Sequence, residues 1–242
     1  MNDLKVRRWT GAFGLAVVVL LLIEFPFRVA LGVPPLLQDA ARYADFVSRT
    51  NGFKLSIILI DMFMMACILV FLAGFRHLIR KAREDAEWVA TLIFGTGLVL
   101  VAITLVADSM EGGTALDTVA GRADPTAITA LTEGYLLLFG SIGCILFALL
   151  SAAAGYATLL TSVLPRWTGW LSYAVAILNL AAIPSIYGGT DAAGFYTAAG
   201  WGVAVIATFP WLIWALIVSI LLIRSREAKA EMLREHELQE AG

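Results

Sequence analysis

The sequence predicts an all-α fold, a polytopic bundle of six transmembrane helices that forms one integral membrane domain over residues 1–242. Three observations predict it. Hydrophobic residues make up 60% of the 242 residues, whereas charged residues make up only 15%. The mean hydropathy of the chain is +0.84, far above that of soluble domains. Apolar runs of about 20 residues, enough for a helix to cross a hydrocarbon core about 30 Å thick, recur along the whole chain.

Six apolar runs are expected to be helical, because a segment in contact with lipid has to satisfy its backbone hydrogen bonds internally. They cover residues 11–33, 55–75, 88–107, 128–154, 167–186 and 202–223. The fourth run is the longest and is expected to tilt or to continue beyond the membrane. After the sixth run, the polar residues 224–242 predict a helical tail in the cytoplasm.

Two connections between the runs are longer than the others. In residues 34–54, the apolar side chains Leu37, Ala41, Ala44 and Val47 share one helical face. This spacing predicts a short amphipathic helix lying on the outer surface of the membrane. Residues 108–127 are acidic and rich in glycine, so we expect a loop that caps a cavity.

The distribution of basic residues predicts the orientation of the bundle. They gather before the first run, between the second and third, between the fourth and fifth, and after the sixth, whereas the opposite connections carry fewer of them. Basic residues are enriched in cytoplasmic loops. Both termini are therefore expected in the cytoplasm, and the protein in the cell inner (plasma) membrane. Membrane lipids are its expected partners.

Composition argues against several classes of function. The net charge is −2 and the basic residues form short groups, so no nucleic acid partner is expected. Cys67 and Cys144 lie inside apolar runs and predict no disulfide framework. The only histidines, His77 and His236, lie outside the runs, which leaves no ligand for haem or zinc and no base for a serine triad. We therefore expect no cofactor and no metal. The sequence does not predict an oligomeric state.

The first apolar run contains two opposite charges. Glu24 and Arg28 are four residues apart, a spacing that allows them to pair along one helix face. Pro26 lies between them and cannot donate a hydrogen bond to the carbonyl of Leu22. A carboxylate, a guanidinium and a free carbonyl oxygen would then lie at one depth. Charges in hydrocarbon are costly and usually face the interior of a bundle, so this arrangement indicates a site.

Acidic residues of other runs reach the same outer level. Asp61 is six residues into the second run, about 9–10 Å below its outer edge at 1.5 Å per residue. Asp108 ends the third run, and Glu133 lies early in the fourth. Asp61 and Glu133 are the candidate catalytic residues. The candidate ligand-binding residues are Glu24, Arg28, Asp108, Asn179, Tyr135 and Trp211. A purely structural interpretation is that these side chains reach the interface or brace neighbouring helices through hydrogen bonds.

Three functions are compatible with this pattern. The first is an outward-facing acidic pocket that binds a hydrophobic ligand of the lipid or isoprenoid type. In its enzymatic version, a carboxyl kept neutral by apolar surroundings acts as a general acid in a proton-initiated isomerisation or cyclisation. The second is a proton- or cation-coupled transporter of small molecules. The third is a structural or accessory membrane subunit without catalysis. The sequence does not decide whether the protein is an enzyme.

Three segments carry a resemblance to a known family. They are "RRWTGAFGLAVVVLLLIEF", "TNGFKLSIILIDMF" and "LLSAAAGYATLLTSVLPRWTGWLSYAVAILNLA". Over residues 5–181 the chain resembles an uncharacterised family of bacterial multi-pass membrane proteins, a domain of unknown function. The resemblance implies about six spans and a bacterial plasma membrane. It implies no catalytic residues.

Overall fold

A computed structural model of the chain describes residues 3–121 and 124–224. No β-strand occurs within these ranges, and the all-helical fold predicted from the sequence is confirmed. The predicted tail falls almost wholly on residues 225–242, which lie outside the described residues.

Six helical stretches are long and apolar enough to cross a membrane. They are α1 (Asp3–Leu31), α2 (Ala40–Ala82), η1 with α3 (Glu84–Ala86 and Glu87–Val119), α4 with η2 and α5 (Pro125–Leu137, Leu138–Ile142 and Gly143–Thr161), α6 with η3 (Arg166–Ala182 and Ile183–Gly188), and α7 with η4 and α8 (Trp201–Val203, Ala204–Thr208 and Phe209–Arg224). Each corresponds to one of the six predicted runs, and only the first run extends beyond its helix, since α1 ends at Leu31 and not at residue 33.

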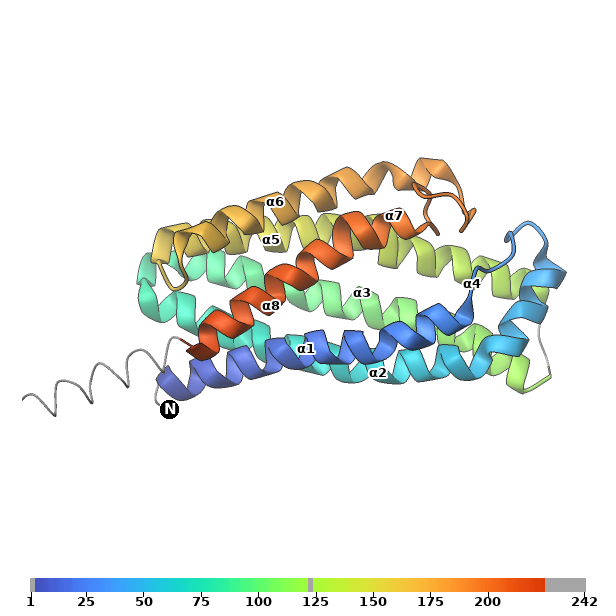
Figure 1. Cartoon of the computed structure of the whole chain (residues 1–242), viewed down its shortest axis with the longest axis horizontal. Helices are drawn as coiled ribbons and strands as arrows, with labels where there is room; N and C mark the ends of the chain where they lie inside the picture. The colour runs from blue at the N-terminus through green and yellow to red at the C-terminus, as the bar shows by residue number, and fades with distance from the viewer. Residues whose placement is uncertain (1–2, 122–123, 225–242) are drawn as a thin grey trace, which may run out of the picture.

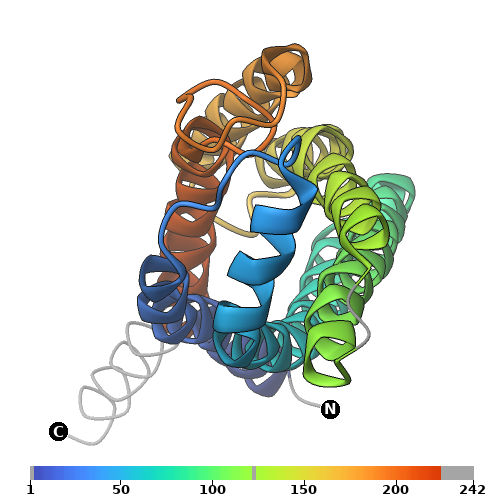
Figure 2. The same ribbon diagram turned by 90° about the vertical axis from the view of Figure 1, so that its right-hand side faces the viewer.

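The six stretches form a closed ring. Each packs on the stretch that follows it in the sequence, and α8 returns to pack on both α6 and α1. Figure 1 shows them running along the long axis of the molecule, and the end view of Figure 2 shows the ring. Short connections between antiparallel neighbours favour this topology.

The amphipathic segment of residues 34–54 differs from the prediction. Most of it is helical, but it is continuous with α2 and does not form a separate helix. Asp39 caps its start by accepting a hydrogen bond from the backbone N–H of Arg42. Its buried face packs on Ile128 of α4 and comprises Leu37, Tyr43, Ala44 and Val47, whereas Ala41 is exposed. The first turns of α2 therefore pack across the end of the ring, as Figure 2 shows.

The prediction of a loop over residues 108–127 is wrong for most of its length, since α3 continues to Val119. Hydroxyl groups stabilise this extension: Thr114 Oγ1 and Thr118 Oγ1 donate to backbone carbonyls of the same helix at 2.7 Å. Gly112 faces Ile58 of α2, where an added Cβ would lie 3.2 Å from the Ile58 Cδ1. The glycines therefore allow a close helix contact, and only a short connection leads to α4.

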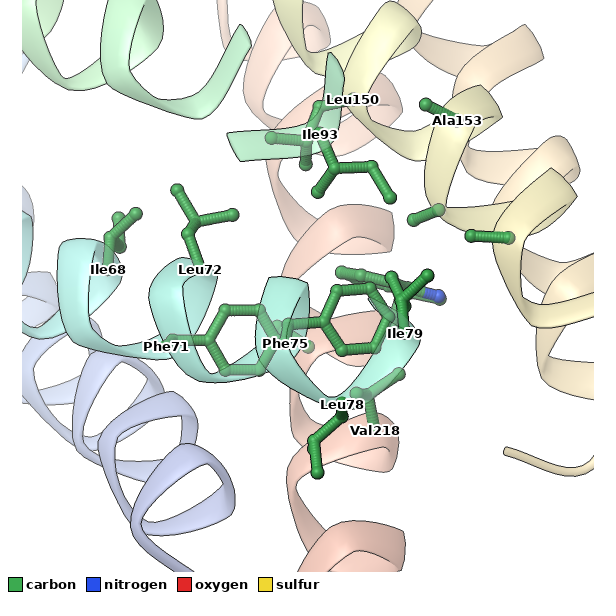
Figure 3. Packing of buried hydrophobic residues seen from close by; sticks show 14 of the residues in the cluster. Ile68, Phe71, Leu72, Phe75, Leu78, Ile79, Ile93, Leu150, Ala153 and Val218 are labelled. Atoms are coloured by element: carbon green, nitrogen blue, oxygen red, sulfur yellow. The ribbon is translucent and has the colours of Figure 1, made fainter. Parts of the chain in front are cut away.

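The hydrophobic core fills one half of the bundle. Phe71 and Phe75 of α2 stack with their ring centroids 5.8 Å apart. Figure 3 shows them next to side chains of the neighbouring helices, among them Ile93 of α3, Leu150 of α5 and Val218 of α8. This core reaches along α2 as far as Met64. Beyond Met64, towards the start of α2, the interior contains charged side chains.

Candidate functional site

A buried ion pair links two neighbouring helices at the polar end of the bundle. Within α1, Arg28 Nε donates a hydrogen bond to Glu24 Oε1, so the pairing expected from their spacing is present. Arg28 Nη2 also lies 3.6 Å from Asp61 Oδ2 of α2. Glu24 and Asp61 are 2% and 1% exposed, whereas the Arg28 side chain is 32% exposed. The guanidinium therefore lies between two buried carboxylates and the outside of the bundle.

Asp108 of α3 completes this group. It is 3% exposed and close enough to Arg28 and Glu24 to interact with both electrostatically. We call Glu24, Arg28, Asp61 and Asp108 the polar cluster. Three carboxylates and one guanidinium from three helices thus share one buried region.

Several carboxylate oxygens of the polar cluster have no hydrogen-bond partner among the described residues. They are Glu24 Oε2, Asp61 Oδ1, Asp61 Oδ2 and Asp108 Oδ2. Buried polar atoms are nearly always hydrogen-bonded, and an unsatisfied buried acceptor costs about 1–3 kcal/mol. Four such acceptors in one place indicate that donors from outside the chain enter this region.

A second buried ion pair lies next to the polar cluster. Lys54 Nζ of α2 donates to Glu111 Oε1 of α3 at 2.9 Å, and the Lys54 ammonium lies 5.9 Å from the centroid of the Tyr43 ring. Neither Lys54 nor Glu111 was predicted from the sequence to belong to a site. The signal was present, since Lys54 is the last residue before the second apolar run and Glu111 follows Asp108 by three residues.

Three adjoining cavities meet at Arg28. The central cavity has a volume of about 120 Å³ and is bordered by Glu24, Arg28 and Asp61 together with four aromatic rings, those of Phe25, Phe139, Trp201 and Phe209. A second cavity of about 220 Å³ extends from Arg28 along Tyr135, Phe139 and residues 198–204. A third of about 200 Å³ reaches Lys54 and Glu111. The lining is mostly apolar with a few convergent charges, which is typical of a small-molecule site.

Two irregular turns shape the wall of these cavities. The segments η2 (Leu138–Ile142) and η4 (Ala204–Thr208) are π-helical, and each interrupts a long helix. In η2, Gly140 has φ −80° and ψ −108°, outside the helical region. Gly140 and Ala204 both border the 220 Å³ cavity. A single π-helical turn within a long helix often occurs at functional sites because it changes the direction of side chains.

The structure separates Glu133 from the residues it was expected to join. Its side chain is exposed on α4 and lines none of the three cavities. Tyr135, two residues later, faces inward and borders two of them. Asp61 and Glu133, the two candidate catalytic residues, therefore do not line a common cavity, and the acidic neighbours of Asp61 are Glu24 and Asp108.

Two further predicted ligand-binding residues lie away from the cavities. Asn179 of α6 is fully buried and donates from Nδ2 to the carbonyl oxygens of Val175 at 3.0 Å and Ala207 at 3.5 Å. It thereby connects α6 to η4. Trp211 of α8 packs edge-on against Phe147, with 5.0 Å between ring centroids, and belongs to the hydrophobic core. Both side chains fit a structural role, whereas the unpredicted Phe139 and Trp201 border the site.

The described residues contain no group of three or more His, Cys, Asp or Glu side chains placed to hold a metal ion. No protein-family model matches the chain, and neither do curated proteins or solved structures. The resemblance to an uncharacterised bacterial membrane family stays a prediction.

Proposed function

We propose that the chain is a multi-pass protein of the bacterial inner (plasma) membrane and that its outward half binds an amphiphilic molecule. The six long apolar helices support membrane insertion. The basic residues at the turn after α2 and beyond α8 support cytoplasmic termini. In this orientation the polar cluster lies in the half of the bundle that faces away from the cytoplasm.

One observation carries the proposal: three adjoining cavities with mostly apolar walls converge on Arg28, where buried carboxylate oxygens accept no hydrogen bond from residues 3–121 and 124–224. An apolar body fits the aromatic and aliphatic walls, and a polar head fits the polar cluster. The partial exposure of Arg28 gives the head a way in from outside. Side chains that only hold neighbouring helices together do not require adjoining cavities, whereas a ligand-binding site does.

The enzymatic version of this function rests on Asp61. Its carboxyl borders the central cavity, so it is the group that would transfer a proton to or from a bound molecule. Glu24 borders the same cavity and takes the catalytic role predicted for Glu133. Proton-initiated isomerisation or cyclisation of an isoprenoid-like molecule would use these two carboxyls in turn.

Native mass spectrometry of the purified full-length protein tests the binding function. Wild-type protein is expected to retain an amphiphile through detergent exchange, and Asp61→Asn to lose most of it. Glu133→Gln is the matched control, because it removes an exposed carboxylate at the same end of the bundle. The same retained molecules in wild type, Asp61→Asn and Glu133→Gln would contradict a pocket at the polar cluster.

A further inference from the structure

We infer that the polar head bound at the central cavity is a protonated amine, so that the ligand class is a cationic amphiphile. This inference rests on the pocket of the proposed function and adds the chemistry of its ligand. It follows from the hydrogen-bonding demand of the cavity, from its charge and from its aromatic rings.

The hydrogen-bonding demand is one-sided. Glu24 Oε2 and both oxygens of Asp61 accept no hydrogen bond from the described residues, and Asp61 Oδ2 has only the ion-pair contact with Arg28 Nη2 at 3.6 Å. Both side chains are at least 98% buried and border the cavity. An ionised carboxylate only accepts hydrogen bonds, whereas an alkylammonium head supplies three donors and no acceptor. A phosphate or carboxylate head would add acceptors where acceptors are already in excess. The cavity is therefore complementary to a donor head.

Charge balance points in the same direction. The polar cluster and the adjoining Lys54–Glu111 pair contain four carboxyl groups, those of Glu24, Asp61, Asp108 and Glu111, and two cations, those of Arg28 and Lys54, so negative charge is in excess when all four carboxyls are ionised. Both cations are already engaged: Arg28 contacts Glu24 and Asp61, and Lys54 contacts Glu111. A buried charge without a counter-charge is strongly unfavourable. A monovalent cation beside Asp61 reduces the excess, and an anion increases it.

The aromatic walls favour a cation as well. Phe25 lies between Trp201 and Phe209, with ring centroids 6.4 Å apart in both pairs. Phe139 already lies below a cation, since the Arg28 guanidinium carbon is 5.9 Å from its ring centroid. The faces of aromatic rings attract cations, and groups of such rings recognise ammonium groups of ligands. Phe25 and Trp201 are also partly exposed, which places this aromatic wall at the entrance.

A series of amphiphiles with one tail and different heads tests the inference. Purified full-length protein in detergent at neutral pH is titrated with octylamine, octyltrimethylammonium, 1-octanol and octanoate, and binding is followed by calorimetry and by the shift in Tm. A ligand that binds only the folded state raises Tm with its concentration. Octylamine is expected to bind at least about tenfold more tightly than the other three, the ratio that one charge-assisted hydrogen bond provides.

Two variants connect the preference to the cavity. Asp61→Asn and Glu24→Gln each remove one acceptor charge with little change of shape, and each is expected to weaken octylamine binding by about tenfold or more. Glu133→Gln is expected to bind like wild type. Using both cavity variants guards against a loss of folding in one of them.

The outcomes separate the inference from the proposed function. Tight binding of 1-octanol or octanoate with no preference for octylamine overturns the amine inference and leaves the apolar pocket standing. Equal binding of octyltrimethylammonium shows that N–H donors are not recognised, which also overturns it. If none of the four amphiphiles binds, both the inference and the proposed function fail.

Discussion

Arg28 Nη2 of α1 lies 3.6 Å from Asp61 Oδ2 of α2, and this contact joins two helices whose other buried contacts are largely apolar. The same guanidinium donates to Glu24, one turn earlier on its own helix. A single cation therefore contacts carboxyl groups of two helices at the point where three cavities meet. Substitution of Arg28 therefore tests both the site and the contact between α1 and α2.

The first prediction concerns the loss of Arg28. Arg28→Ala leaves two buried carboxylates without their counter-charge and is expected to lower the free energy of unfolding by about 3–5 kcal/mol. The combined variant Glu24→Gln with Arg28→Gln removes both charges of the α1 pair and is expected to be less destabilised than Arg28→Ala. Thermal unfolding in detergent measures both.

An exposed pair provides the control for this comparison. Arg49 pairs with Asp45 one turn earlier on α2, and both side chains are largely exposed. Arg49→Ala is expected to change stability by no more than about 1 kcal/mol. An equal loss of stability in Arg28→Ala and Arg49→Ala would contradict the prediction. It would show that Arg28, like Arg49, is solvated and does not stabilise buried carboxylates.

The second prediction concerns the Lys54–Glu111 pair between α2 and α3. Lys54→Met leaves Glu111 without its donor and is expected to destabilise the protein by about 3 kcal/mol or more. Adding Glu111→Gln is expected to recover part of this loss, since it removes the unpaired charge. Additive effects of the two substitutions in a double-mutant cycle would show that the pair contributes no coupling.

The third prediction concerns glycine packing between α1 and α8. An added Cβ at Gly11 would lie 2.7 Å from the backbone oxygen of Ser219, so Gly11→Ala has to push two helices apart. We expect a loss of about 1–3 kcal/mol, as in other overpacked interiors. Gly95 of α3 has nothing within 4 Å of its added Cβ. Gly95→Ala is therefore the control, and thermal unfolding should show it to be neutral or slightly stabilising.

The fourth prediction concerns orientation. In a chain whose two cysteines have been replaced, Cys67→Ala and Cys144→Ala, single cysteines are placed at Ala193 and Ala82, both of which are exposed. An impermeant thiol reagent applied to intact cells should label the cysteine at position 193 and not that at position 82. Labelling at position 82 alone would place the polar cluster on the cytoplasmic side.

The sequence was sufficient to predict the six long apolar helices, because each needs a long apolar run. It was also sufficient to predict that Glu24, Asp61 and Asp108 lie at one level of the bundle, because their positions follow from counting residues along each helix. The Glu24–Arg28 contact followed from their spacing alone.

The rotation of each helix about its axis could not be predicted in the same way. Glu133 and Tyr135 are two residues apart and therefore about 200° apart around a helix, so they cannot both face the same interior. Both the carboxyl of Glu133 and the phenol of Tyr135 were predicted to belong to the site. In the packed bundle, Tyr135 is the one that borders the cavities. An apolar helix with few charges has no clear polar face from which this rotation could be inferred.

The continuity of the amphipathic helix with α2, and the helical extension of α3, were not predicted for a related reason. Charges and glycines in residues 34–54 and 108–127 suggested surface segments. In the fold, Lys54 of the first segment pairs with Glu111 of the second, across α2 and α3. A long-range pair of this kind is not visible in the local sequence.

Photo-crosslinking at the wall of the central cavity tests the central claim most directly. A benzophenone amino acid at position 139 replaces the ring of Phe139, which borders the cavity, and the same group at position 63 replaces the exposed Phe63 of α2. After irradiation in membranes, mass spectrometry identifies the adducts. The account predicts a restricted set of amphiphile adducts at position 139 that disappears in Asp61→Asn, and bulk lipid adducts at position 63 that do not change. Bulk lipid at both positions, unaffected by Asp61→Asn, would contradict it.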